Sequence, residues 1–175
     1  VNNLERFNIF FPERRQFFLE NSGIWAGGRQ QSIRPFFSRR IGLQGEFNAI
    51  PAAIDVGARF TQRTEKNALA GLFVRQRETE NSAGSNFGVL RYLKNYGREN
   101  NIGVMVTHRL DDTFSDLGLE SNNNTTITLD GQIRPTSQWD IQYMLSSSID
   151  EGTGKTGYAG RLFFGNNSNK FYYGW

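Results

Sequence analysis

Arginine side chains are the most concentrated source of binding chemistry in this chain. A guanidinium is permanently charged and presents a planar fork of donors to carboxylates and phosphates. Eight arginines fall on the polar side of alternating segments: Arg59, Arg63, Arg75, Arg77, Arg91, Arg109, Arg134 and Arg161. If that side lines a lumen, we expect it to attract anionic solutes or to dock an acidic plug. The alternative is internal pairing with nearby carboxylates, namely Asp55, Glu78, Asp130 and Asp140.

The first 51 residues are rich in phenylalanine and arginine and contain two motifs of the same chemistry. The motif residues are Phe11, Pro12, Glu13, Arg14, Arg15, Phe18 and Glu20 in the first, and Ser38, Arg39 and Arg40 in the second. Their guanidinium groups could clamp a ligand carboxylate or phosphate. We favour a structural role, in which a folded-in segment packs through its aromatic rings and forms buried pairs of Glu13 or Glu20 with arginine. This segment is predicted to face the lumen or the periplasm, with a first strand at 34–41.

The other polar groups match no catalytic or metal-binding spacing. Four acidic residues belong to the longest predicted loop: Asp111, Asp112, Asp116 and Glu120. Carboxylates suit calcium, but this spacing is not that of an EF-hand loop. His108 is the only histidine and there is no cysteine, so we predict no zinc site. The net charge of +3 is dispersed and predicts no nucleic-acid partner. We expect no catalytic site, metal or cofactor.

The segments that must position these groups read as β-strands. In 135–148, four apolar residues share one face: Trp139, Ile141, Tyr143 and Leu145. Polar residues occupy most alternate positions, which is typical of a strand with one apolar and one polar side. Its length of about eleven residues exceeds the usual five or six and matches the nine to eleven that cross a bilayer. The pattern predicts a membrane-spanning strand with its apolar side outward.

The same alternation recurs through residues 52–175, which we predict to be successive antiparallel membrane-spanning strands. The apolar faces are expected to form one outward belt, represented by Leu72, Val104, Ile141 and Leu162. Short connections are predicted at 64–67, 95–100, 135–137 and 166–170, and longer ones at 79–85, 110–124 and 149–156. Outer-membrane barrels alternate short periplasmic turns with longer extracellular loops in this way. No run approaches the eighteen apolar residues of a transmembrane helix.

Two motifs resemble the beginning of a known barrel. The sequences FFPERRQFFLEN (10–21) and FFSRRIG (36–42) are similar to those of a Gram-negative outer-membrane family of uncharacterised function. IPAAIDVGARFT (50–61) and NFGVLR (86–91) resemble its early strands. Members usually carry an upstream carbohydrate-binding-family-9-like domain. The resemblance implies the front part of a larger barrel, with that domain and the remaining strands as partners, and it carries over no catalytic residues.

We therefore predict an all-β fold, an antiparallel up-and-down transmembrane β-barrel segment in the Gram-negative outer membrane. The expected function is porin-like transport, docking or surface binding, with outer-membrane lipid and a glycan or anionic solute as partners. The main alternative is a soluble all-β ligand-binding module, lipocalin-like or lectin-like, whose apolar face encloses a core. A third reading is an outer-membrane hydrolase that would depend on His108.

Overall fold

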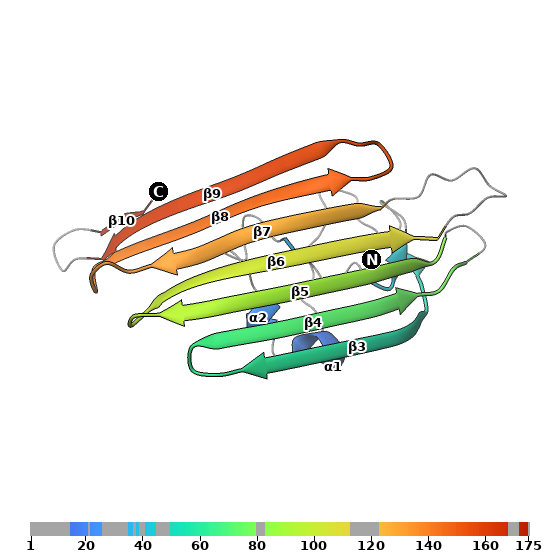
Figure 1. Cartoon of the computed structure of the whole chain (residues 1–175), viewed down its shortest axis with the longest axis horizontal. Helices are drawn as coiled ribbons and strands as arrows, with labels where there is room; N and C mark the ends of the chain where they lie inside the picture. The colour runs from blue at the N-terminus through green and yellow to red at the C-terminus, as the bar shows by residue number, and fades with distance from the viewer. Residues whose placement is uncertain are drawn as a thin grey trace.

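The computed structural model describes residues 15–20, 22–25, 35–36, 38, 41–44, 50–79, 83–112, 123–167 and 172–174. Its main element is an eight-stranded antiparallel sheet with the order β10-β9-β8-β7-β6-β5-β4-β3, so that each strand pairs with its neighbours in sequence (Figure 1). The predicted all-β, up-and-down antiparallel fold is confirmed. The sheet is open, because β3 and β10 lie at its two edges.

Seven strands of the sheet are long, at 10 or 12 residues each: β3 (Ile54–Arg63), β4 (Asn67–Gln76), β5 (Ser85–Tyr96), β6 (Asn100–Asp111), β7 (Asn124–Ile133), β8 (Trp139–Asp150) and β9 (Thr156–Asn167). The edge strand β10 (Tyr172–Gly174) is short. A separate two-stranded ladder joins β1 (Leu43–Gln44) to β2 (Ile50–Pro51), and two short helices precede it, α1 (Gln16–Leu19) and α2 (Ser22–Trp25). No helix in these ranges is long and apolar enough to cross a membrane.

Tight turns close one end of the sheet, at the left in Figure 1, through residues 64–66, 97–99 and 134–138. Thr64 closes the first of them, since its N–H and hydroxyl both donate to the carbonyl of Asn67 (2.7 and 3.1 Å). Gly97 has a φ of +64°, which glycine adopts without a side-chain clash. The connections at the opposite end are 77–84, 112–123 and 151–155. The predicted alternation of lengths holds from β3 to β7, whereas 151–155 is no longer than 134–138.

One side of the sheet, which we call the outer face, presents large apolar side chains to the surroundings. Its exposed members include Val56, Phe60, Leu69, Phe73, Leu90, Tyr92, Ile102, Val104, Ile127, Trp139, Leu145, Tyr158, Leu162 and Phe164. Strand registers place these residues in common rows, for example Tyr92 opposite both Leu69 and Val104. The alternation predicted for β5 to β9 is thereby confirmed.

The opposite side, the inner face, carries the two helices over β3 to β6. Phe18, Ile24 and Trp25 are buried there, in one cluster with residues of the sheet and with Ile41. The sheet contributes mostly small or flexible apolar side chains to this cluster: Ala68, Ala70, Leu72, Val74, Val89 and Met105. Small residues let the helices approach the sheet closely. At Gly57, an added Cβ would lie 3.1 Å from Cζ of Phe17.

Two predictions about individual elements are wrong. Leu72 was expected in the outward belt, but it is buried on the inner face, because its register pairs it with Arg59 and Val89. Strand β4 is apolar on both sides, so alternation alone could not orient it. The described residues within 34–41 do not form a strand either. Ile41 donates to the carbonyl of Ser38 (2.9 Å) in a turn.

Candidate functional site

A buried ion pair stands at the centre of the inner face. Arg91 of β5 is 2% exposed and reaches across β6 to Asp130 of β7, which is 6% exposed. The pair is bidentate, with 2.8 Å between Arg91 Nη2 and Asp130 Oδ2. Between them lies Gly103, where an added Cβ would be 2.7 Å from Arg91 Nη2. Glycine at that position therefore lets the guanidinium lie flat against the sheet.

Arginines also fasten the N-terminal segment to the inner face. Arg91 Nε donates to the carbonyl of Ile24 (3.3 Å), at the end of α2. Arg59 donates to the carbonyls of Phe17 and Glu20 (2.7 and 3.0 Å) and pairs with the Glu20 carboxylate. Glu20 directly follows α1, and the last carbonyls of a helix have no intrahelical donor and are favourable sites for cations.

Arg15 holds the beginning of that segment. Its two terminal nitrogens donate to the carbonyls of Ile41 (2.6 Å) and Ser38 (2.9 Å), and its guanidinium lies 4.3 Å from the ring centre of Phe18. Glu20 pairs with an arginine as predicted, but its side chain is 63% exposed and not buried as expected. The remaining opening-motif residues lie outside the described residues: Phe11, Pro12, Glu13, Arg14, Arg39 and Arg40.

The inner face of β7 and β8 has a different chemistry, because hydroxyl groups form a ladder along it. The hydroxyls of Thr128 and Ser146 are 2.8 Å apart, and those of Thr126 and Ser148 are 3.2 Å apart. Asn124 Oδ1 accepts from both Thr126 and Ser148 (3.1 and 3.0 Å). The neighbouring strand β9 places Ala159 opposite Ser146 and Gly157 opposite Ser148, and both small residues are exposed. Toward the long connections this wall is hydrophilic and carries little side-chain bulk, whereas Met144 and Phe163 are buried on the same face toward the tight turns.

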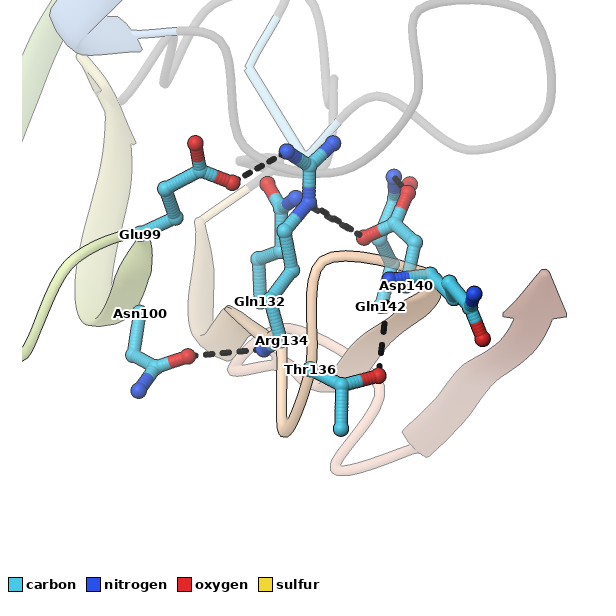
Figure 2. Close-up of polar contacts among 8 residues, drawn as sticks. Glu99, Asn100, Gln132, Arg134, Thr136, Asp140 and Gln142 are labelled. Atoms are coloured by element: carbon cyan, nitrogen blue, oxygen red, sulfur yellow. Dashed lines mark hydrogen bonds and ion pairs between the residues drawn. The ribbon is translucent and has the colours of Figure 1, made fainter. Parts of the chain in front are cut away.

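At the tight-turn end of the same strands, polar side chains converge around Asp140 and Arg134 (Figure 2). Asp140 accepts from the side-chain amides of Gln132 and Gln142, both at 2.8 Å, and lies 3.7 Å from Arg134 Nε. Arg134 also pairs with Glu99, and that hydrogen bond holds the pKa of Arg134 above its ordinary value. The cluster links the turns at 97–99 and 134–138, and its two carboxylates outnumber its single guanidinium.

Six of the eight predicted arginines pair with a described carboxylate: Arg59 with Glu20, Arg75 with Asp112, Arg77 with Asp55, Arg91 with Asp130, Arg109 with Asp111 and Arg134 with Glu99. Arg161 instead lies 5.7 Å from the ring centre of Phe163. Within the described ranges, neither Arg63 nor Arg161 forms an ion pair with a carboxylate. Of the acids expected as partners, Asp55, Asp130 and Asp140 take that role, while Glu78 has no described ion pair. Most of the eight arginines are therefore neutralised by ion pairs within the protein.

Two of these arginines do not have the predicted orientation. Arg75 belongs to the outer-face series of β4, with Phe73, and its register partner is Asn86. It ends near the long connections, where it donates to Asp112 (2.8 Å). Arg77 lies beyond the end of β4 and pairs with Asp55. A charged residue at a strand end stays in contact with water on either face, so alternation does not fix its side.

The remaining sequence candidates are also placed. His108 lies at the outer-face positions of β6 and its Nδ1 is 2.8 Å from the Thr125 hydroxyl. Arg75 holds the pKa of the Asp112 carboxyl below its ordinary value through the hydrogen bond that joins them. Asp116 and Glu120 lie outside the described residues. In the part of the chain that the structure describes, no group of three or more potential ligands could hold a metal ion.

The hydroxyl ladder was not anticipated as a unit. Its members come from two strands, and only the register Thr128–Ser146 and Thr126–Ser148 brings them together. The signal in the sequence is the pair of small polar runs, 124–128 and 146–148, in adjacent predicted strands.

Comparisons with known proteins return no relative. The chain matches no protein-family model, and searches of curated proteins and of solved structures find no significant match.

Proposed function

We propose that this chain forms part of the wall of an outer-membrane β-barrel through which hydrophilic solutes cross. The observation that carries the proposal is the outer face, where large apolar side chains are exposed along β3 to β9. Leu145 is 62% and Leu162 59% exposed, both on 12-residue strands. A contiguous apolar surface of this extent needs an apolar partner. Lipid fits it, because strands of this length cross a bilayer when tilted.

The chemistry of the inner face supports the same orientation. Arginine at mid-depth on a lipid-facing surface costs about 2–4 kcal/mol, and Arg91 is instead paired with Asp130 on the opposite side. Hydroxyl groups line the inner side of β7 and β8. An apolar exterior with a polar interior is the arrangement of membrane barrels.

The soluble ligand-binding alternative requires the outer-face residues to form a core. The cluster that packs under the helices instead uses inner-face residues such as Ala70, Val74 and Met105. A soluble protein would then need a second covering layer on the outer face. We favour the membrane for that reason.

Two further parts of the proposal, closure of the barrel and location in the outer membrane, are supported by separate arguments. Unpaired backbone groups are not tolerated in lipid, so the edges at β3 and β10 must be paired by further strands to close a barrel. The resemblance of the opening motifs to the Gram-negative family supports the outer membrane as the location. It also suggests that an upstream carbohydrate-binding domain links the barrel to glycans, with docking or surface binding as an associated role.

Membrane fractionation of the whole protein tests the location. We expect it in the outer membrane, with a shift in gel mobility when the detergent extract is boiled, because closed barrels resist unfolding without heat. A monomeric protein that stays in solution without detergent would overturn the proposal. The apolar outer face would then have to enclose a core.

A pair of substitutions on β9 tests which face meets lipid. Leu162→Arg places a charge on the outer face and should cost about 2–4 kcal/mol of unfolding free energy in lipid vesicles. Ala159→Arg places the same charge on the inner face and should change it by less than about 1 kcal/mol. Urea titration of the two variants measures the difference. Equal effects would contradict the assignment of the faces.

A further inference from the structure

We infer that the hydrophilic passage opens along the inner face of β7 to β9 at the end nearest the long connections and admits small uncharged polar solutes, sugars or polyols, in preference to anions. This inference rests on the proposed function and specifies the route and the class of solute. It departs from the first expectation of an arginine-lined anion channel.

The route follows from what already occupies the inner face. The helices fill the side over β3 to β6, where Phe18, Ile24 and Trp25 are buried against the sheet. None of the described residues in this cluster belongs to β7, β8 or β9. Toward the tight turns, however, Met144 and Phe163 of these strands are buried, at 2% and 8% exposed. Toward the long connections, Ser146 and Ser148 are partly exposed and Gly157 and Ala159 are exposed. The open part of the inner face is therefore the end of β7 to β9 nearest the long connections.

The solute class follows from the side chains of that wall. Thr126, Ser146 and Ser148 are partly exposed and carry hydroxyls, which both donate and accept hydrogen bonds. Gly157 and Ala159 beside them are exposed and leave room for a solute next to those hydroxyls. A solute with several hydroxyl groups can exchange its hydrogen bonds with water for bonds to such a wall.

The charges of the wall do not favour anions. Asp130 and Asp140 are bonded to Arg91 and to the cluster around Arg134. Asp150 accepts from the N–H groups of Gly152 and Thr153, both at 3.0 Å, in the turn after β8. The cation left unpaired by a described carboxylate is Arg161, which lies over Phe163. One cation gives a much weaker field than the ring of charges that selects ions in channels.

Adjacent serines provide a matched test of the route. The 175 residues contain no cysteine, and register places Ser146 on the inner face and Ser147 on the outer face, opposite Ile127. A charged, membrane-impermeant thiol reagent should react with the Ser146→Cys variant in vesicles. Its reaction with the Ser147→Cys variant should be slower by a factor of about ten or more, since a thiolate does not form readily in lipid. No reaction at position 146 would overturn the route.

Vesicle swelling tests the solute class. The whole protein in lipid vesicles should admit arabinose, and a potassium chloride gradient should give a reversal potential close to zero. The Ala159→Phe variant should slow arabinose entry severalfold, whereas Ser147→Phe, on the outer face, should leave it unchanged. Marked anion selectivity that Arg161→Gln abolishes would overturn the inference, as would arabinose entry at the normal rate in Ala159→Phe.

The outcomes separate this inference from the function on which it rests. A protein that enters vesicles, shifts on boiling and excludes arabinose would keep its place in the membrane and lose the proposed route. A protein that does not enter vesicles would remove both. Faster labelling at position 147 than at 146 would mean that the two faces are exchanged.

Discussion

The two halves of the inner face differ in what their side chains can pack against. Over β3 to β6 the face is small and apolar, with Ala68, Ala70 and Val74 almost fully buried beneath the helices. Over β7 to β9 hydroxyls, amides and glycine predominate, although Met144 and Phe163 are buried there too, and no described residue of this half belongs to the cluster under the helices. The inner face of one sheet with uniform strand pairing thus has two halves: an apolar half over β3 to β6, which packs against the helices, and a polar half over β7 to β9. The buried pair Arg91–Asp130 joins them.

Breaking that pair should have the largest effect. Asp130→Ala leaves the Arg91 guanidinium buried without a counter-charge, which typically costs about 3–5 kcal/mol. Urea unfolding in lipid vesicles measures this loss. The double variant Arg91→Met with Asp130→Leu should recover most of it, because replacing both members by apolar groups is often neutral or stabilising. A single variant as stable as the parent would show that water reaches Arg91.

A substitution at Ile24, which is 2% exposed, tests the packing of the helices on the apolar half. Ile24→Ala should cost about 2–5 kcal/mol, through lost apolar burial and the cavity left behind. We expect the cost to appear mainly as release of the helices, seen as faster proteolysis within 15–25 while the sheet stays folded. Leu19→Ala is the control, since Leu19 lies on α1 and is exposed. It should change stability by less than about 0.5 kcal/mol.

Substitutions in the polar half should cost less stability than those in the apolar half. Thr128→Val removes the hydroxyl that contacts Ser146 and should cost about 1 kcal/mol, the usual net value of a hydrogen bond. Ser146 is partly exposed and can bond water instead. The same urea titration measures the change. A loss as large as that of Asp130→Ala would mean that this half is packed as tightly as the other.

The smallest expected effect is a pH dependence of stability that arises at the long connections, outside both halves of the inner face. The hydrogen bond from Arg75 lowers the pKa of Asp112 in the folded protein below its ordinary value of 3.8. A lowered carboxyl pKa stabilises the fold above about pH 4, and the contribution disappears as the pH falls through the folded-state value. Unfolding midpoints between pH 7 and pH 2 should show a small decline in this acidic window. Asp112→Asn should flatten that part of the profile.

Much of the fold could be predicted because alternation has a direct physical cause. Successive strand residues point to opposite faces, so Ile102, Val104 and Val106 had to share a side opposite Met105. The method failed at β4, where Leu72 and Phe73 are both apolar, although Leu72 is buried on the inner face and Phe73 is exposed on the outer face. It also failed at Arg75, because a charged side chain near a strand end can contact water from either face.

The sequence by itself determined the strands, their antiparallel order and the apolar outer face, since period-2 patterns and turn residues act over a few neighbouring positions. Only the tertiary structure decided which arginines are neutralised and which part of the inner face is covered. Arg91 meets Asp130 across an intervening strand, and Arg59 meets Glu20, which directly follows α1 and lies 39 residues away in the sequence. Such partners depend on strand register and on how the N-terminal segment folds back, and neither is encoded in a local pattern.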